Sequence, residues 1–153
     1  GMNLGDSTIF SVTGALVKIY GSQSLMASID YKKINGINKV FIHNGTKELD
    51  LSLEEYIKTV ENLNIGEIYL NSIERDGTGF GYDIDTISKV SMNIKVPIIL
   101  AGGAGNENHL IVGLERDDVS AVATANLFNF IGDGLPKARI KILEEGLNIS
   151  KWS

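Results

Sequence analysis

The sequence contains no cysteine and only two histidines among its 153 residues. The lack of cysteine excludes disulfide bonds and thiolate metal sites. The histidines, His43 and His109, are not arranged in an HxH or HExxH spacing, so a histidine metal site is not expected. His43 falls in a predicted hairpin and His109 in the first turn of a predicted helix. We therefore expect both side chains to lie at the surface.

Long apolar runs and an excess of positive charge are also lacking. No stretch approaches the ~20 apolar residues that a membrane-spanning helix needs, and no basic segment leads into an apolar one as in a secretion signal. These absences predict a cytoplasmic protein that does not bind membranes. The net charge of −5 and the pI of 5.0 disfavour a general nucleic-acid surface. With 43% hydrophobic and 22% charged residues, the composition predicts one globular domain over residues 1–153.

Glycine is abundant, with 17 residues against 2 prolines, and strand patterns alternate with helix patterns. This alternation predicts an α/β fold with a parallel sheet and outer helices. Asn35-Gly36 between two strand-like runs indicates a hairpin. The four predicted parallel strands are Leu25–Asp30, Glu67–Asn71, Val96–Ala101 and Val119–Thr124.

Helix starts are marked by capping residues. Ser52 and Glu55 form a capping box before a helix predicted over residues 53–64. Asp83 and Asn106 are predicted to cap two further helices. Leu135-Pro136 begins a last helix, whose apolar face is expected to carry Ile140 and Leu143.

Polar and glycine-rich segments follow the predicted strands directly, at the sheet edge where ligands bind. Asp30 ends the first strand, where partial desolvation suits a group that transfers protons. Its alternative roles are a cap or a partner of a nearby lysine. The loop 75–81 and the segment 102–105 contain glycines that let backbone N–H groups approach a phosphate. Each also fits an ordinary turn or a solvated loop, but together they predict one phosphate site.

Several motifs carry a resemblance to a known family. Gly21-Ser22-Gln23 precedes the strand that ends in Ser28-Ile29-Asp30. The string from Asn71 to Thr78 is followed by Gly81-Tyr82-Asp83, and Gly102-Gly103-Ala104-Gly105 comes after the third strand. Over residues 11–130 the sequence is similar to the cyclase subunit of imidazole glycerol phosphate synthase, with Ser-Ile-x-Arg-Asp-Gly-Thr-x-x-Gly-Tyr-Asp as the most specific string.

The resemblance implies an eight-stranded (β/α) TIM barrel, of which the chain matches only strands five to eight. Family enzymes cyclise a bisphosphorylated aminoimidazole ribonucleotide with ammonia, and two aspartates do the acid–base work. Asp30 matches the second aspartate, and the first has no counterpart here. Glu67 matches an acidic residue at the ammonia entrance. No cofactor and no metal are implied. The residues expected to hold one substrate phosphate are Asp76, Gly77, Gly103, Ala125 and Asn126, with Asn126 replacing a more usual serine.

The resemblance also implies partners. A glutaminase would deliver ammonia at the opposite barrel mouth. Because four strands cannot close a barrel, we expect a second half-barrel, either a second copy in a homodimer or a separate N-terminal half. The uncovered concave face is expected to carry Ile29, Ile68, Leu70, Ile99 and Val122 or their immediate neighbours.

Alternative functions stay open. The leading hypothesis is half of a histidine-biosynthetic cyclase that is nearly inactive alone. The others are a phosphate-ligand binding module without turnover and an interaction fragment. A further alternative comes from Asn71, which stands where histidine-pathway enzymes commonly carry threonine. In this it resembles paralogues that act with an amidotransferase in surface-polysaccharide sugar synthesis.

Overall fold

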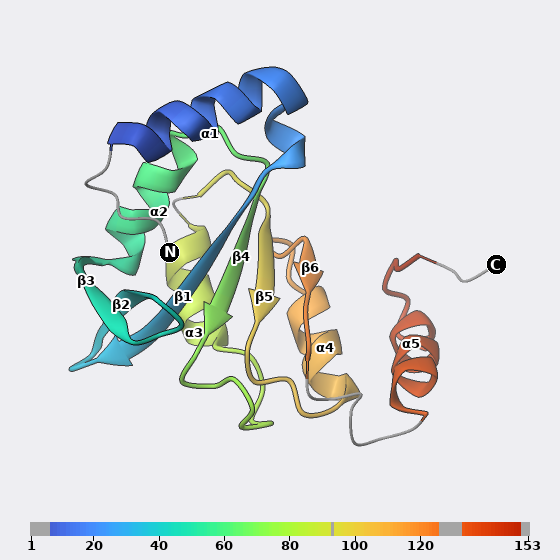
Figure 1. The fold of residues 1–153 in the computed structure, drawn as a ribbon. Helices are drawn as coiled ribbons and strands as arrows, with labels where there is room; N and C mark the ends of the chain where they lie inside the picture. Colours follow the sequence, from blue (N-terminus) through green and yellow to red (C-terminus); the bar gives the residue numbers. More distant parts are fainter. Residues whose placement is uncertain (1–6, 93, 126–132, 151–153) are drawn as a thin grey trace.

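The computed structural model describes residues 7–92, 94–125 and 133–150. Its helices and strands follow one another as in Figure 1. The elements are α1 (Ser7–Tyr20), a 3-10 turn (Ser22–Ser24), β1 (Met26–Ile34), β2 (Ile37–Ile42), β3 (Lys47–Ser52), α2 (Leu53–Glu61), β4 (Glu67–Ser72), α3 (Ile84–Ser91), β5 (Ile98–Ala101), α4 (Glu107–Leu114), β6 (Ala121–Val122) and α5 (Gly134–Glu144).

The strands form one six-stranded sheet in the order β3-β2-β1-β4-β5-β6. β1, β4, β5 and β6 run parallel, while β2 and β3 extend the sheet antiparallel beyond β1. The four predicted parallel strands are thus confirmed, and the mixed α/β sheet is consistent with a partial (β/α) barrel. The described core residues form one hydrophobic cluster.

Local sequence signals explain where the elements begin and turn. The Ser52 side chain accepts a hydrogen bond from the Glu55 N–H, and the Glu55 carboxylate accepts from the Ser52 N–H, so the predicted capping box is present. Asp83 and Asn106 cap α3 and α4 with their side chains. The hairpin between β1 and β2 turns at Asn35-Gly36, where both residues have positive φ, as a type I′ turn requires.

Several element boundaries differ from the sequence-based prediction. β1 continues to Ile34 because its carboxyl half pairs with β2. β3 was not predicted, and α2 ends at Glu61 rather than near residue 64. The strand predicted over residues 119–124 is regular only at Ala121–Val122.

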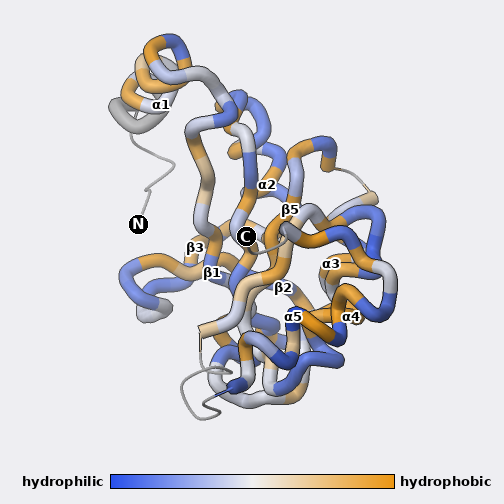
Figure 2. Tube along the Cα trace, turned by 90° about the vertical axis from the view of Figure 1, so that its right-hand side faces the viewer, coloured by the Kyte–Doolittle hydropathy of each residue, from blue (hydrophilic) through white to orange (hydrophobic). Residues whose placement is uncertain are grey.

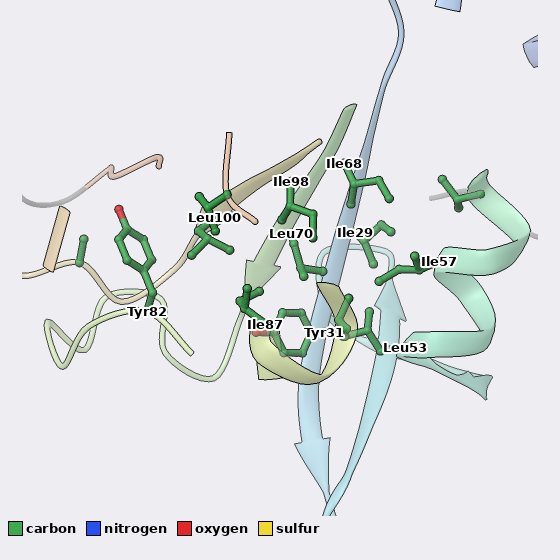
Figure 3. Close-up of a cluster of buried hydrophobic side chains, with 14 of the residues drawn as sticks. Ile29, Tyr31, Leu53, Ile57, Ile68, Leu70, Tyr82, Ile87, Ile98 and Leu100 are labelled. Atoms are coloured by element: carbon green, nitrogen blue, oxygen red, sulfur yellow. The ribbon is translucent and has the colours of Figure 1, made fainter. Parts of the chain in front are cut away.

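The hydrophobic core lies between the sheet and the outer helices. In Figures 1 and 2, α3 and α4 lie on the same side of the sheet. Figure 3 shows Ile29 and Ile68 pointing toward α2, with Leu70 in the same cluster. These three side chains are at most 1% exposed. The prediction that they line the concave face is therefore wrong.

The opposite, concave face is largely polar. It carries the residues that alternate with the core positions, because neighbouring residues on a strand point to opposite faces. Val122 packs with the core, against α4, so only Ile99 of the five named apolar residues lies on the concave face. The described side chains of that face include Ser28, Asp30, Tyr69, Asn71 and Ile99, which are half-buried or exposed.

The last helix turns a different side toward the molecule than predicted. Ala138 and Ile142 of α5 are buried, whereas Ile140 is 57% exposed and Leu143 37% exposed. α5 packs on α4, and the small side chain of Ala138 permits the close approach of the two helices. The prediction that Ile140 and Leu143 form the inward face is therefore wrong.

Candidate functional site

The candidate site lies at the carboxyl ends of the parallel strands, where several loops meet. Two residues at this edge, Asp30 on β1 and Asn71 on β4, lie opposite each other in the strand register. The Asn71 side-chain amide donates a hydrogen bond of 2.9 Å to Oδ1 of Asp30. Both side chains are half-buried on the concave face. The bond fixes the direction of the Asp30 carboxylate through one of its two oxygens.

A tyrosine that the sequence reasoning missed stands beside this pair. Tyr69 lies on the concave face of β4, two residues before Asn71. Burial raises the pKa of its phenol, and the nearby carboxylates of Asp76 and Asp30 raise it further. The concave face therefore holds a protonated hydroxyl among carboxylates. The strand alternation between Tyr69 and Asn71 was the signal that could have found it.

The glycine loop after β4, residues 73–82, is held at its base by charge and hydrogen bonds. The Asp76 N–H donates to the Ser72 carbonyl (2.9 Å). Arg75 forms an ion pair with Asp83 (3.9 Å between Nη2 and Oδ1) and donates to the Gly81 carbonyl (3.3 Å). The charged partner of Arg75 is thus Asp83, the N-cap residue of α3.

Asp83 in turn anchors the loop to the core. Its other carboxylate oxygen accepts a hydrogen bond from the buried Tyr31 hydroxyl (3.3 Å). Burial first, and then the Asp83 charge, raises the pKa of Tyr31, so this phenol keeps its proton and remains a donor.

The glycines after β5 are required because the chain touches the neighbouring loop there. The Gly81 N–H donates to the Gly103 carbonyl at 2.7 Å. A Cβ on Gly103 would lie 2.2 Å from the Gly81 carbonyl oxygen, and one on Gly105 would lie 2.4 Å from that of Gly79. A Cβ on Gly102 would lie 2.5 Å from the Ser72 carbonyl oxygen. The two glycine loops therefore interlock backbone to backbone.

A hydrogen bond connects the end of β6 to the same region. The Tyr82 hydroxyl donates to the Ala123 carbonyl at 2.9 Å, just before Ala125. Ala125, Asp76 and Gly77 are exposed, and Gly103 is buried. Asn126, also predicted to hold phosphate, lies outside the described residues. The structure thus brings together the loops that carry Asp76, Gly77 and Gly103 at the ends of β4 and β5, next to Asn71, the hydrogen-bond partner of Asp30. Their contact with a phosphate stays a prediction.

Glu67 lies at the opposite end of the sheet. It is the first residue of β4 and pairs in register with Met26. It stands four positions before Asn71, which corresponds to about 13 Å along a strand. Its side chain is half-buried. This position is separate from the candidate site, and the role of Glu67 at an ammonia entrance stays a prediction.

A cavity of about 550 Å³ opens beside the free edge of β1. It is lined by Met26–Asp30, by Val40–Asn44 and by Tyr56 and Val60 of α2. β1 pairs with β2 only from Asp30 onward, and in the described residues no strand pairs with Met26–Ile29 on that side. The cavity therefore marks an unpartnered strand edge, and the glycine loops do not line it.

The described residues form neither a membrane-spanning helix nor a metal-binding cluster of side chains. None of their helices is long and apolar enough to cross a membrane. No group of His, Asp or Glu side chains in the same ranges is arranged to hold a metal ion. The cytoplasmic location stays a prediction.

Comparisons with known proteins place the chain in a family. Residues 8–132 match the model of the family described as histidine biosynthesis protein. The chain is 41% identical over 142 residues to the putative imidazole glycerol phosphate synthase subunit hisF2 of Parasynechococcus marenigrum (strain WH8102), covering 92% of this chain and 53% of that protein. It is 44% identical over 114 residues to the putative subunit hisF2 of Pseudomonas aeruginosa (74% and 45% covered).

A third relative is named as a HisF subunit without the word putative. The chain is 36% identical over 130 residues to imidazole glycerol phosphate synthase subunit HisF of Pelodictyon phaeoclathratiforme, covering 85% of this chain and 52% of that protein. The chain thus spans about half the length of the curated relatives that it matches. From the matched length and these identities, the chain belongs to the histidine biosynthesis protein family and is related to its imidazole glycerol phosphate synthase HisF subunits.

Proposed function

We propose that this chain supplies the carboxyl-terminal half of a cyclase barrel of imidazole glycerol phosphate synthase. The reaction would close the imidazole ring of a bisphosphorylated ribonucleotide with ammonia from a partner glutaminase, and it would be a lyase reaction of histidine biosynthesis. The observation that carries the proposal is the oriented Asp30 carboxylate beside two interlocked glycine loops at one sheet edge. The family membership supports the same reading.

Each part of the site has a role in this proposal. Asp30 acts as the acid–base group, with Asn71 holding its carboxylate toward the substrate. The loops that carry Gly77 and Gly103 hold one substrate phosphate through backbone N–H groups. Ammonia enters from the opposite mouth near Glu67 and travels along the concave face, so that the nucleophile reaches the substrate shielded from water.

The four parallel strands of the described residues form only part of an eight-stranded barrel. We propose that a second copy supplies the rest, with a parallel strand added at the free edge of β1. In the described residues no strand pairs with Met26–Ile29 on the side that faces away from β4. This free edge and the adjacent cavity support the proposal, because an open strand edge readily accepts another strand. α1 adds to the argument with an uncovered apolar stripe, Val12, Leu16, Ile19 and Tyr20. A two-fold dimer would also place a second Asp30 across the barrel.

Light scattering on the purified chain tests the dimer. We expect a dimer at micromolar concentration. Ser28→Pro should weaken it, because the Ser28 backbone faces away from β4, toward the free edge, and proline cannot donate to a strand ladder. A stable monomer would contradict the homodimer. A chain that associates only after a separately produced amino-terminal half is added would assign the missing half to another protein.

Turnover tests the reaction. We expect the chain alone to be nearly inactive, because one of two acid–base groups is absent and such a group contributes about 10²–10⁴-fold. Ammonia-dependent ring closure should appear when the amino-terminal half of a relative is added, and Asp30→Asn should abolish it. Asp85→Asn, an exposed aspartate on α3, is the matched control. Strong turnover that survives Asp30→Asn would contradict the proposal.

A second candidate function has an observation in its favour. Identity reaches 41–44% with the relatives named as putative hisF2 or as putative HisF subunits, against 34–37% with those named HisF without qualification. Together with Asn71, this favours a paralogue that serves amidation in surface-polysaccharide sugar synthesis. A reconstituted barrel that binds phosphate esters but does not cyclise the ribonucleotide, even after Asn71→Thr, would favour that role. A binding module without turnover would behave in the same way in this assay.

A further inference from the structure

The imidazole ring of His109 lies between the two glycine loops of the candidate site. His109 lies in the first turn of α4 and is half-buried. The Gly105 N–H donates a hydrogen bond of 3.0 Å to its Nδ1. A surface role was expected for this histidine, but the structure places its ring against backbone of the loop after β5.

The hydrogen bond fixes the state of the ring. A backbone N–H can only donate, so Nδ1 must be the acceptor and carries no proton. The ring is therefore neutral, with its proton on Nε2. The N-terminus of α4 is already capped, because Asn106 Oδ1 accepts from the His109 N–H at 3.1 Å. Helix capping alone thus does not explain the imidazole.

The other edge of the ring faces the loop after β4. A Cβ built on Gly81 would lie 3.3 Å from Cδ2 of His109 and 3.5 Å from its Nε2. Gly81 is the residue whose N–H donates to the Gly103 carbonyl. The imidazole therefore lies next to Gly81 on one edge and holds the Gly105 N–H on the other, between the two loops.

We propose that His109 is a positioning residue for the phosphate site. It holds the loops that carry Gly77 and Gly103 at the separation that a phosphate needs, through the acceptor at Nδ1 and the bulk of the ring. This inference rests on the proposed function, which assigns a phosphate to these loops. A pre-formed loop pair binds more tightly, because no ordering cost arises on binding.

Two substitutions separate the acceptor from the bulk of the ring. His109→Asn keeps an acceptor close to the place of Nδ1, whereas His109→Leu keeps an apolar side chain of similar reach without an acceptor. His43→Asn is the matched control, because His43 is exposed in the β2–β3 connection and asparagine tolerates its positive φ. Binding of inorganic phosphate is measured by calorimetry, and exchange of the Gly105 and Gly81 amides by NMR.

We expect His109→Leu to weaken phosphate binding about threefold to tenfold, the value of one hydrogen bond, and to speed exchange of both amides. His109→Asn should restore binding to within about twofold, and His43→Asn should change nothing. Unchanged binding and exchange in His109→Leu would overturn the proposal. So would a His109→Asn variant as weak as His109→Leu, since the acceptor would then not matter.

The wild-type protein provides a test that needs no variant. Nitrogen NMR of the imidazole should show Nδ1 unprotonated and Nε2 protonated at neutral pH, and a proton on Nδ1 would overturn the proposal. If wild-type protein binds no phosphate, the proposed function fails at this site. The exchange of the Gly105 and Gly81 amides still decides whether His109 positions the loops.

Discussion

Replacing Gly103 with alanine tests the interlocked glycine loops most directly. The added methyl group would lie 2.2 Å from the Gly81 carbonyl oxygen and 2.9 Å from its carbon. Both of these are backbone atoms, so no flexible side chain can move aside. The residue also has a φ of +107°, which an L side chain rarely adopts. The loop 79–81 must therefore shift, and the hydrogen bond from the Gly81 N–H is lost.

The expected cost follows from these two effects. Backbone strain at such a position costs about 1–3 kcal/mol, and the lost hydrogen bond adds about 1 kcal/mol. We therefore expect a loss of about 2–4 kcal/mol in the free energy of unfolding. Phosphate binding should also weaken, because the shifted residues belong to the loop 73–82, which includes Gly77, the other proposed phosphate-binding glycine.

Urea unfolding of the variant and of a matched control measures this cost. Gly146→Ala is the control, since Gly146 has a φ of +80° with no atom within 4 Å of an added Cβ. Its free energy of unfolding should fall only by the backbone strain, about 1–2 kcal/mol. Equal losses in the two variants, or unchanged phosphate binding in Gly103→Ala, would refute the reasoning that the loops interlock.

Three further predictions test other parts of the structure. Asp30→Asn should lower the raised pKa of Tyr69, because a nearby negative charge disfavours the phenolate, and an unchanged pH titration of that ring would place the carboxylate elsewhere. Ser52→Ala should destabilise the protein by about 1 kcal/mol in urea unfolding through loss of the α2 cap, and a value near zero would contradict the capping box. Ile142→Ala should lower the free energy of unfolding by about 2–5 kcal/mol and Ile140→Ala by under about 0.5 kcal/mol. The reverse order in thermal unfolding would mean that α5 buries Ile140, as the sequence predicted.

The candidate site could be located from the sequence only in outline. The order of strands and glycine loops placed Asp30 and Gly103 at one sheet edge, because carboxyl ends of parallel strands meet there. The hydrogen bond from Asn71 to Asp30 and the contact of His109 with Gly105 join residues 41 and four positions apart. Such contacts depend on rotamers and on strand register, which a pattern of residue types does not specify.

One mistake could have been avoided from the sequence itself. Ile29 and Asp30 are neighbours on a strand, so they must point to opposite faces of the sheet. Placing Asp30 in the concave face therefore assigns Ile29 to the helix layer, as the structure shows. The unpredicted β3 is different, because its residues, Lys47–Ser52, include three charges and become a strand only by pairing with β2.

The features that depend only on neighbouring residues could be predicted from the sequence. These are the Ser52–Glu55 capping box, the caps of α3 and α4, the Asn35-Gly36 turn, and the strand–helix alternation that leads to a parallel sheet. Their energies are set within a few residues. The buried side of α5, the pairing of β3 with the sheet and the interlocking of the glycine loops became clear only from the three-dimensional structure. Those features are set by packing between segments distant in the chain, where the close approach of two backbones selects the residue that fits.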